Sequence, residues 1–257
     1  MSLGRCIYRE ESAEAHLEIW EQDECRSLWF DDVILQSEIH IEDPAVLPNP
    51  VNRTMLAHLM LDLPLSRVML AGCGGGAIAR WLNARAPEVT GDAIELSATV
   101  ARLAREYFDF PSLQSNWQLL VEDVREHLPH STVQYDFILV DLEENQVTPD
   151  WVTDAGFLAE CLAHLSSRGV LTINLILDDN QAISEALFRI RQVFGTEVLL
   201  VTEPEHDNLV VLAFRSTAPE IPAQAVLHER GKRWGIDFVT TVTRMTRLAA
   251  KKSVPAP

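Results

Sequence analysis

A cluster of glycines that follows a short apolar run constrains the fold of this chain more than any other feature. The run is Val68–Ala71, four of the next five residues (Gly72–Gly76) are glycine, and apolar residues resume at helical spacing in Ile78–Leu82. Glycine tolerates positive φ and lets a ligand approach the backbone closely, while a helix start offers free N–H groups and partial positive charge. The pattern predicts a strand, a tight turn and a helix that bind a nucleoside or nucleotide; the alternative is a structural turn.

The composition of the 257 residues argues against several classes of partner. The net charge is −17, and binding to nucleic acid needs clustered Lys and Arg to neutralise phosphates. No apolar run reaches the ~18 residues of a membrane span, and the first residues lack the apolar region of a secretion signal. The cysteines form no Cys-x-x-Cys pair, and the histidines show no metal-binding spacing. We therefore expect a cytoplasmic protein without a metal, nucleic-acid or membrane partner.

The first fifty residues are predicted to form a small antiparallel β appendage. Apolar and polar residues alternate over His16–Glu21, and two further stretches, Ser27–Phe30 and Val33–Leu35, flank a predicted turn at Asp31-Asp32. Three prolines between positions 44 and 50 mark the end of this segment. We therefore expect an appendage over residues 1–50 and a larger domain over residues 51–257.

Strands and helices alternate through the larger domain after a predicted helix over Asn52–Leu63. Beyond the glycine turn, the predicted strands are Val89–Glu95, Trp117–Val121, Tyr135–Asp141, Val170–Ile176, Glu197–Thr202 and Asn208–Phe214, and the predicted helices are one capped by Ser97, Asp150–Leu165 and Asp179–Phe194, with a turn at Ser166–Gly169. The five residues between the last two strands are too few for a helical crossover, so this pair must be antiparallel. We predict an α/β fold with a doubly wound, mostly parallel, seven-stranded Rossmann-like methyltransferase sheet that ends in this pair.

Three acidic residues lie where predicted parallel strands end, which is the edge where doubly wound sheets bind ligands. Glu95 follows the glycines by about twenty residues, where a carboxylate either accepts the hydroxyl hydrogens of a ribose or remains solvated. Asp123, beside Glu122, is placed either to hold an adenine amino group or to cap the next helix. Asp141 follows a strongly apolar strand and either orients an attacking amine or caps the next loop.

A nicotinamide dinucleotide is the competing ligand of this edge. Gly72, Gly74 and Ala77 satisfy the pattern G-x-G-x-x-G/A, and Glu95 suits that motif as well. The glycines therefore do not decide between the ligands, whereas the terminal antiparallel pair and the acid at Asp141 favour the methyltransferase fold.

Four segments resemble the spermidine synthase family of polyamine aminopropyltransferases, particularly its divergent bacterial spermidine synthase-like members. They are Val68–Leu82, Asp92–Glu95, Tyr135–Asp141 and Gly169–Asn174, and the similarity in order and spacing extends over roughly residues 15–245. Upstream, Phe30–Gln36 resembles the family's hairpin that ends in Gln, and Met55–Leu59 resembles its Met-Leu-Ala-His-Leu helix. A small β appendage before a methyltransferase-like domain is also the layout of that family.

The resemblance implies binding of decarboxylated S-adenosylmethionine, or of its product methylthioadenosine, and transfer of an aminopropyl group to a small-molecule amine. Gly72, Gly74 and Gly76 would lie at the cofactor. Glu95 would hold the ribose, and Asp123 would lie on the adenine side. The family is commonly dimeric or larger, so a homodimer is the assembly that the resemblance implies.

The resemblance also implies two roles nearer the reacting atoms. Asp141 would match the catalytic acid near the attacking amine, and Gln36 would match a residue that lies over the nucleoside. The reaction would be a displacement at the carbon beside the sulfonium.

Two segments depart from the family's pattern. Asn52-Arg53-Thr54 stands in the place of Tyr-His-Glu, and Leu142–Gln146 replaces Asp-Ser-x-Asp-Pro-x-Gly-Pro after the acid of the fourth strand. In the family these segments hold the polyamine. Two alternatives therefore stay open: an S-adenosylmethionine-dependent methyltransferase that acts on an unknown small acceptor and releases S-adenosylhomocysteine, and a non-catalytic nucleoside-binding homologue.

Overall fold

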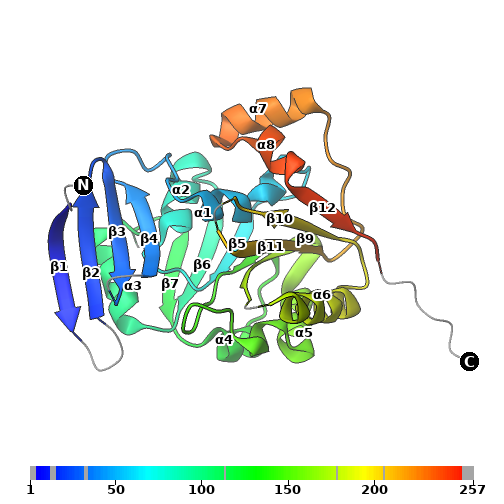
Figure 1. The fold of residues 1–257 in the computed structure, drawn as a ribbon, viewed down its shortest axis with the longest axis horizontal. Helices are drawn as coiled ribbons and strands as arrows, with labels where there is room; N and C mark the ends of the chain where they lie inside the picture. Colours follow the sequence, from blue (N-terminus) through cyan, green and yellow to red (C-terminus); the bar gives the residue numbers. More distant parts are fainter. Residues whose placement is uncertain are drawn as a thin grey trace, which may run out of the picture.

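The computed structural model contains two β-sheets, one small and one large (Figure 1). It describes residues 4–11, 16–31, 34–112, 114–177, 179–204 and 206–250. Two residues of the predicted hairpin, Asp32 and Val33, lie outside the described residues.

The small sheet is the predicted N-terminal appendage, with one more strand than expected. Its strands are β1 (Arg5–Glu11), β2 (His16–Gln22), β3 (Cys25–Phe30) and β4 (Ile34–His40), which pair antiparallel in that order. Leu17 and Ile19 of β2 and Leu28 of β3 are almost completely buried and join the core shared with the large sheet. This packing brings β4 against the glycine turn of the larger sheet.

The large sheet confirms the predicted doubly wound fold and contains eight strands in the order β12-β10-β11-β9-β8-β5-β6-β7. They are β5 (Arg67–Ala71), β6 (Thr90–Glu95), β7 (Trp117–Val121), β8 (Tyr135–Val140), β9 (Leu165–Ile176), β10 (Val198–Thr202), β11 (Asn208–Phe214) and β12 (Met245–Leu248). The strands from β9 to β7 in this order are parallel, and β11, β10 and β12 add antiparallel pairings. The additional strand β12 lies at the edge of the sheet.

Helices cover both faces of this sheet (Figure 1). They are α1 (Pro50–Met55), α2 (Ala77–Arg85), α3 (Ala98–Tyr107), α4 (Val124–His130), α5 (Ala155–His164), α6 (Asn180–Phe194), α7 (Gln224–Trp234) and α8 (Phe238–Thr243). Ser97 caps α3 by accepting a hydrogen bond from the Val100 N–H at 3.3 Å, as its sequence position predicts. No helix within the described ranges has both the length and the apolar character that crossing a membrane requires.

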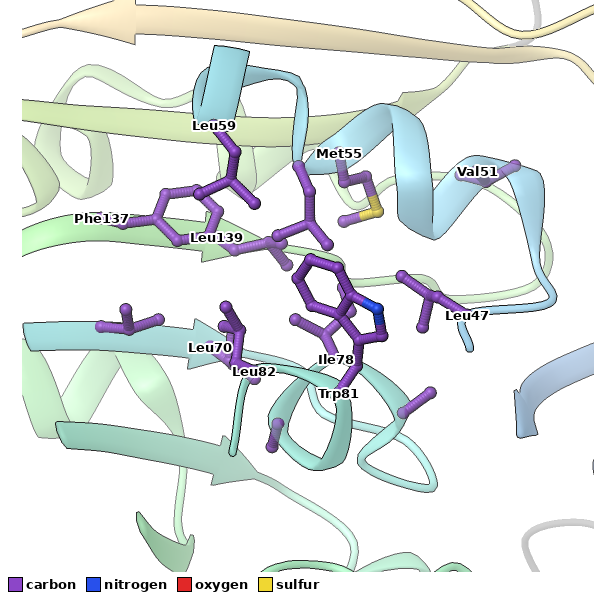
Figure 2. Packing of buried hydrophobic residues seen from close by; sticks show 14 of the residues in the cluster. Leu47, Val51, Met55, Leu59, Leu70, Ile78, Trp81, Leu82, Phe137 and Leu139 are labelled. Carbon is purple, nitrogen blue, oxygen red and sulfur yellow. The ribbon is translucent and has the colours of Figure 1, made fainter. Parts of the chain in front are cut away.

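Alternating residues of the central strands point to opposite faces of the sheet. Phe137 and Leu139 of β8 belong to the core beneath α1 and α2, where Figure 2 shows them facing Leu59 and Trp81. Ile138 belongs to the second core, which also contains residues of α4, α5 and α6. The strand is therefore buried on both faces, as its uninterrupted apolar run predicts.

The predicted helix over Asn52–Leu63 is wrong in its middle. Helix α1 ends at Met55, Leu56 departs from helical geometry (φ −91°, ψ 14°), and a separate 3₁₀ helix follows at Ala57–Met60. Every side chain from Thr54 to Leu61 is buried. Since the segment has no solvent face, packing on both sides sets the path of the chain and overrides its helical periodicity.

The predicted turn at Ser166–Gly169 is also wrong, because these residues lie within β9. The pairing of β8 with β9 changes register there, from Tyr135 opposite Leu165 to Phe137 opposite Val170. The turn-forming residues therefore make an irregularity inside a strand. The predicted helix over Asp150–Leu165 is divided in a similar way, into a 3₁₀ helix at Asp150–Thr153 and α5.

Candidate functional site

The glycine turn lies after β5 in a conformation that demands glycine at three positions. Gly72, Gly74 and Gly76 have φ values of +79°, +50° and +80°. A Cβ at Gly72 would lie 2.1 Å from the carbonyl oxygen of Asp141, and one at Gly74 would lie 3.1 Å from that of Gln36. The missing side chains therefore let β4, β5 and the end of β8 converge at one point.

A cavity of about 50 Å³ occupies this point of convergence. Gln36, Gly72, Gly74 and Asp141, which the sequence singled out separately, all line it. Its volume is a fraction of the roughly 300–1,000 Å³ of a typical ligand pocket. A nucleoside bound here would therefore place only one part in the cavity and extend along the open edge of the sheet.

Two polar residues of the cavity wall were not predicted as site residues from the sequence. Ser37 comes from β4 of the appendage, and Asn52 comes from α1. The departure from the family's pattern at Asn52 was the only available signal for either residue.

Glu95 ends β6 and binds the backbone of the glycine turn. Its Oε2 accepts hydrogen bonds from the N–H groups of Cys73 at 3.3 Å and Gly74 at 3.1 Å, and its Oε1 accepts one from Ser97 at 3.0 Å. Burial raises the pKa of Glu95, and these N–H groups oppose that rise because they favour the ionised form. Glu95 thus stabilises the turn, and its contact with a ribose stays a prediction.

Asp123 is the N-cap of α4. Its carboxylate accepts from the Arg125 N–H at 2.8 Å and pairs with the Arg125 guanidinium at 2.5 Å. These hydrogen bonds hold the pKa of Asp123 below its ordinary value. The structure thus contains the helix cap that was one of the two interpretations, and the adenine contact stays a prediction.

An exposed pair of apolar side chains lies beside Glu95. Leu96 is 69% exposed and Val121 is 47% exposed, and they are two of four large apolar side chains exposed in the described part of the chain. The pairing of β6 with β7 sets Glu95 opposite Val121. Leu96, which follows Glu95, and Val121 therefore both lie at the carboxyl edge of the sheet. We call Leu96 and Val121 the apolar ledge. An apolar residue directly after a strand-end acid was the sequence signal for it.

Asp141 connects to two asparagines on neighbouring strands. Its backbone N–H donates to the Ala71 carbonyl at 2.9 Å, which fixes the main chain beside the glycine turn. Its Oδ1 accepts from Asn174 Nδ2 at 2.9 Å, and Asn174 Oδ1 accepts from Asn208 Nδ2 at 3.0 Å. Burial raises the pKa of Asp141, and the hydrogen bond from Asn174 opposes the rise. A carboxylate in this setting can accept a hydrogen bond from an amine.

The segment that stands in place of Tyr-His-Glu binds its surroundings through Arg53 and Thr54. Arg53 donates to the carbonyl oxygens of Leu47 and Pro48, and its pKa is lowered by burial. Thr54 donates to Glu203, whose carboxylate also pairs with Arg244 at 2.7 Å. The side chains of Glu203 and Arg244 are only 10% and 20% exposed, so the carboxylate beside Thr54 already has a cationic partner. Among the described residues, no group of three or more His, Cys, Asp or Glu side chains is arranged to hold a metal ion.

Comparisons with known proteins agree with this architecture. Residues 68–169 match the family model of the methyltransferase domain. A polyamine aminopropyltransferase from Chromobacterium violaceum is 27% identical over 237 residues, which cover 91% of this chain and 90% of that protein. The chain is thus similar in sequence to polyamine aminopropyltransferases over most of its length.

Solved structures extend the spermidine synthase-like similarity to the fold of nearly the whole chain. A probable spermidine synthase from Corynebacterium glutamicum superposes with a TM-score of 0.75 at 17% identity and covers 97% of this chain and 92% of its own. A spermidine synthase in complex with the transition state analogue AdoDATO has a TM-score of 0.69 at 19% identity, over 94% of this chain and 86% of its own. At these identities the likeness concerns the fold.

Proposed function

We propose that this spermidine synthase-like protein transfers an aminopropyl group from decarboxylated S-adenosylmethionine to the nitrogen of a small amine. The observation that carries the proposal is the cavity in which Asp141 meets Gln36 and the glycine turn. The residues that we propose as catalytic acid, nucleoside-binding turn and covering residue therefore line one cavity. Relatives named polyamine aminopropyltransferase support the reaction type.

The aminopropyl donor, decarboxylated S-adenosylmethionine, would lie along the carboxyl edge of the sheet from the cavity to the apolar ledge. Its adenine would rest on Leu96 and Val121, whose exposed surfaces otherwise face water. Glu95 already accepts backbone N–H groups on both carboxylate oxygens, and its backbone donors include Leu96 as well as Cys73, Gly74 and Ser97. An ionised carboxylate has about four lone-pair positions, so we propose that Glu95 accepts at most one ribose hydroxyl rather than both.

The cavity would hold the reacting centre. In the step, the lone pair of a neutral amine forms a bond to the carbon beside the sulfonium, and the carbon–sulfur bond breaks with its electron pair moving to sulfur. The products are methylthioadenosine and an aminopropylated amine, which then releases one proton. Asp141 would accept a hydrogen bond from the amine and stabilise the positive charge that develops on nitrogen. The proton passes to solvent, because reference pKa values of carboxylates and amines differ by about six units.

The acceptor side is proposed to take a small amine near Asp141 and Glu143. The pKa of Glu143 is raised by burial and by the negative charge of Asp141, so a cationic or hydrogen-bond-donating group placed between the two would relieve that repulsion. Glu203 contributes less attraction, because Arg244 and Thr54 already occupy its carboxylate.

A methyltransferase activity is the second candidate. The match of residues 68–169 to the methyltransferase domain and the paired charge of Glu203 favour it over binding of a dication. It would use carboxylated S-adenosylmethionine on a small acceptor, whereas a homologue without activity would bind the nucleoside only.

Two measurements separate these functions. Isothermal titration with S-adenosylmethionine and with its decarboxylated form identifies the preferred donor. Incubation of the protein with decarboxylated donor and a panel of small amines, putrescine included, should release methylthioadenosine. If the protein binds neither form, both enzyme proposals fail; if it binds the decarboxylated form but yields no methylthioadenosine with any amine, the aminopropyl proposal fails.

The Asp141→Asn variant tests the assigned catalytic acid. We expect it to lose turnover while binding methylthioadenosine as the wild type does, because the amide keeps the shape but lacks the negative charge. The control is Asp136→Asn, at the opposite end of β8, where the side chain accepts from the Ser66 backbone N–H at 2.8 Å. Unchanged turnover in Asp141→Asn would remove this residue from the mechanism.

A further inference from the structure

Three neighbouring strands place Asp141, Asn174 and Asn208 side by side across the sheet. The parallel pairing of β8 with β9 sets Val140 opposite Ile173, so the next residues, Asp141 and Asn174, are adjacent. The antiparallel pairing of β9 with β11 sets Ile176 opposite Asn208, which makes Asn208 the diagonal neighbour of Asn174. The three side chains therefore share one face at the edge where the cavity lies.

Two hydrogen bonds join these three side chains into a row, and their directions depend on each other. Asn208 donates its Nδ2–H to Asn174 Oδ1 at 3.0 Å, and Asn174 donates its Nδ2–H to Asp141 Oδ1 at 2.9 Å. If the Asn174 amide were reversed, its oxygen would face a carboxylate oxygen and its NH₂ would face another NH₂. Asn174 is only 4% exposed, so water cannot compensate for such a mismatch. The Asp141 carboxylate, which only accepts, thereby determines that Asn174 presents its NH₂ to it, and Asn208 donates to the Asn174 oxygen that this orientation leaves.

This row also assigns different tasks to the two oxygens of Asp141. Oδ1 is held by Asn174, and the main chain is held by the hydrogen bond from the Asp141 N–H to Ala71 at 2.9 Å. The carboxylate cannot rotate without breaking the bond from Asn174. No described residue donates a hydrogen bond to Oδ2, and Asp141 lines the cavity, so Oδ2 is the oxygen available to a bound amine.

We infer that Asn174 and Asn208 are positioning residues that hold Asp141 with one carboxylate oxygen directed toward the acceptor amine. The inference deepens the proposed aminopropyl transfer and rests on it for the identity of the amine. Neither asparagine touches the substrate; Asn174 acts on Asp141 directly, and Asn208 acts through Asn174.

The test compares Asn174→Leu and Asn208→Leu with Thr172→Val. Thr172 lies two residues before Asn174 on β9, is fully buried, and its hydroxyl has no hydrogen-bond partner among the described residues. The first readout is the titration of the Asp141 carboxyl by carbon NMR in protein labelled at aspartate, assigned with Asp141→Asn. We expect the Asp141 pKa to rise in Asn174→Leu, to rise less in Asn208→Leu, and to stay unchanged in Thr172→Val, because hydrogen bonds to a carboxylate favour its ionised form.

The second readout is turnover with the amine that the wild type accepts. We expect a loss of about tenfold or more in kcat for Asn174→Leu, with methylthioadenosine binding retained, since a hydrogen bond to a charged group is removed. An unchanged Asp141 titration in both asparagine variants would overturn the inference. Asn208 is only partly buried, so Asn208→Leu keeps the test valid if Asn174→Leu does not fold. If the wild type transfers no aminopropyl group, the proposed function fails, whereas the titration still decides whether the row controls Asp141.

Discussion

Replacing Gly72 by alanine should damage both stability and transfer, and the structure separates the two causes. An added Cβ would lie 2.1 Å from the Asp141 carbonyl oxygen, whereas real Cβ atoms essentially never approach closer than 3.0 Å. The end of β8 must therefore retreat by roughly 1 Å, a displacement that can cost about 10²-fold in rate when it misplaces a reacting group. It also strains the hydrogen bond from the Asp141 N–H to Ala71.

Gly195→Ala provides the matched control. Gly195 has a similar φ of +65°, but a Cβ there meets nothing within 4 Å. Each alanine should lose about 1–2 kcal/mol to the left-handed backbone. Gly72→Ala should lose roughly 1 kcal/mol or more in addition, because a backbone hydrogen bond is also strained.

The assay is denaturant unfolding of both variants, followed by methylthioadenosine release at saturating donor. We expect Gly72→Ala to be the less stable of the two and to lose about 10²-fold in turnover, while Gly195→Ala keeps wild-type turnover. Equal free energies of unfolding for the two variants, or wild-type turnover in Gly72→Ala, would refute the argument that the close approach to Asp141 requires this glycine.

Two further predictions concern the buried carboxylates. Glu95→Gln should lose about 1–3 kcal/mol in free energy of unfolding, because an amide NH₂ would face backbone N–H donors of the glycine turn or of Ser97. The same change should weaken methylthioadenosine binding in calorimetry. Wild-type stability and affinity in this variant would contradict the role given to Glu95. Because the pKa of Asp141 is raised, activity and stability should change in opposite directions with pH. As pH rises through that pKa, transfer should increase, whereas the free energy of unfolding of the wild type should fall relative to that of Asp141→Asn. The sign follows because the folded state binds this proton more tightly than the unfolded state, and parallel pH–stability curves for the two proteins would exclude it.

Local patterns in the sequence were enough to predict most of the strands and helices of the larger domain. The apolar run of β8 indicated burial on both faces, and alternate residues do enter the two cores. Ser97 caps its helix as predicted, and the helix predicted from Asp179 begins directly after that residue, because helix starts depend on residues within one turn. The five-residue connection required β10 and β11 to be antiparallel. Each of these features depends on residues that are close together in the chain.

The strand β12 and the break at Leu56 could not be predicted in the same way. Met245–Leu248 becomes a strand because it pairs with β10, more than forty residues earlier. The segment around Leu56 is buried on all sides, so its neighbours in space determine its path. Strand propensity and helical periodicity are weak guides where tertiary packing decides.

The candidate site likewise has a part that the local sequence predicts and a part that depends on tertiary packing. The sequence by itself determined the glycine turn and the strand-end acids Glu95 and Asp141, because a turn's φ angles and a strand's end are local properties. Only the tertiary structure decided that Ser37 and Asn52 share a cavity with Asp141, and that Asn208 reaches Asp141 through Asn174. Those contacts arise from the packing of the appendage and from the register between strands, and residues distant in the chain meet only when the sheet has assembled.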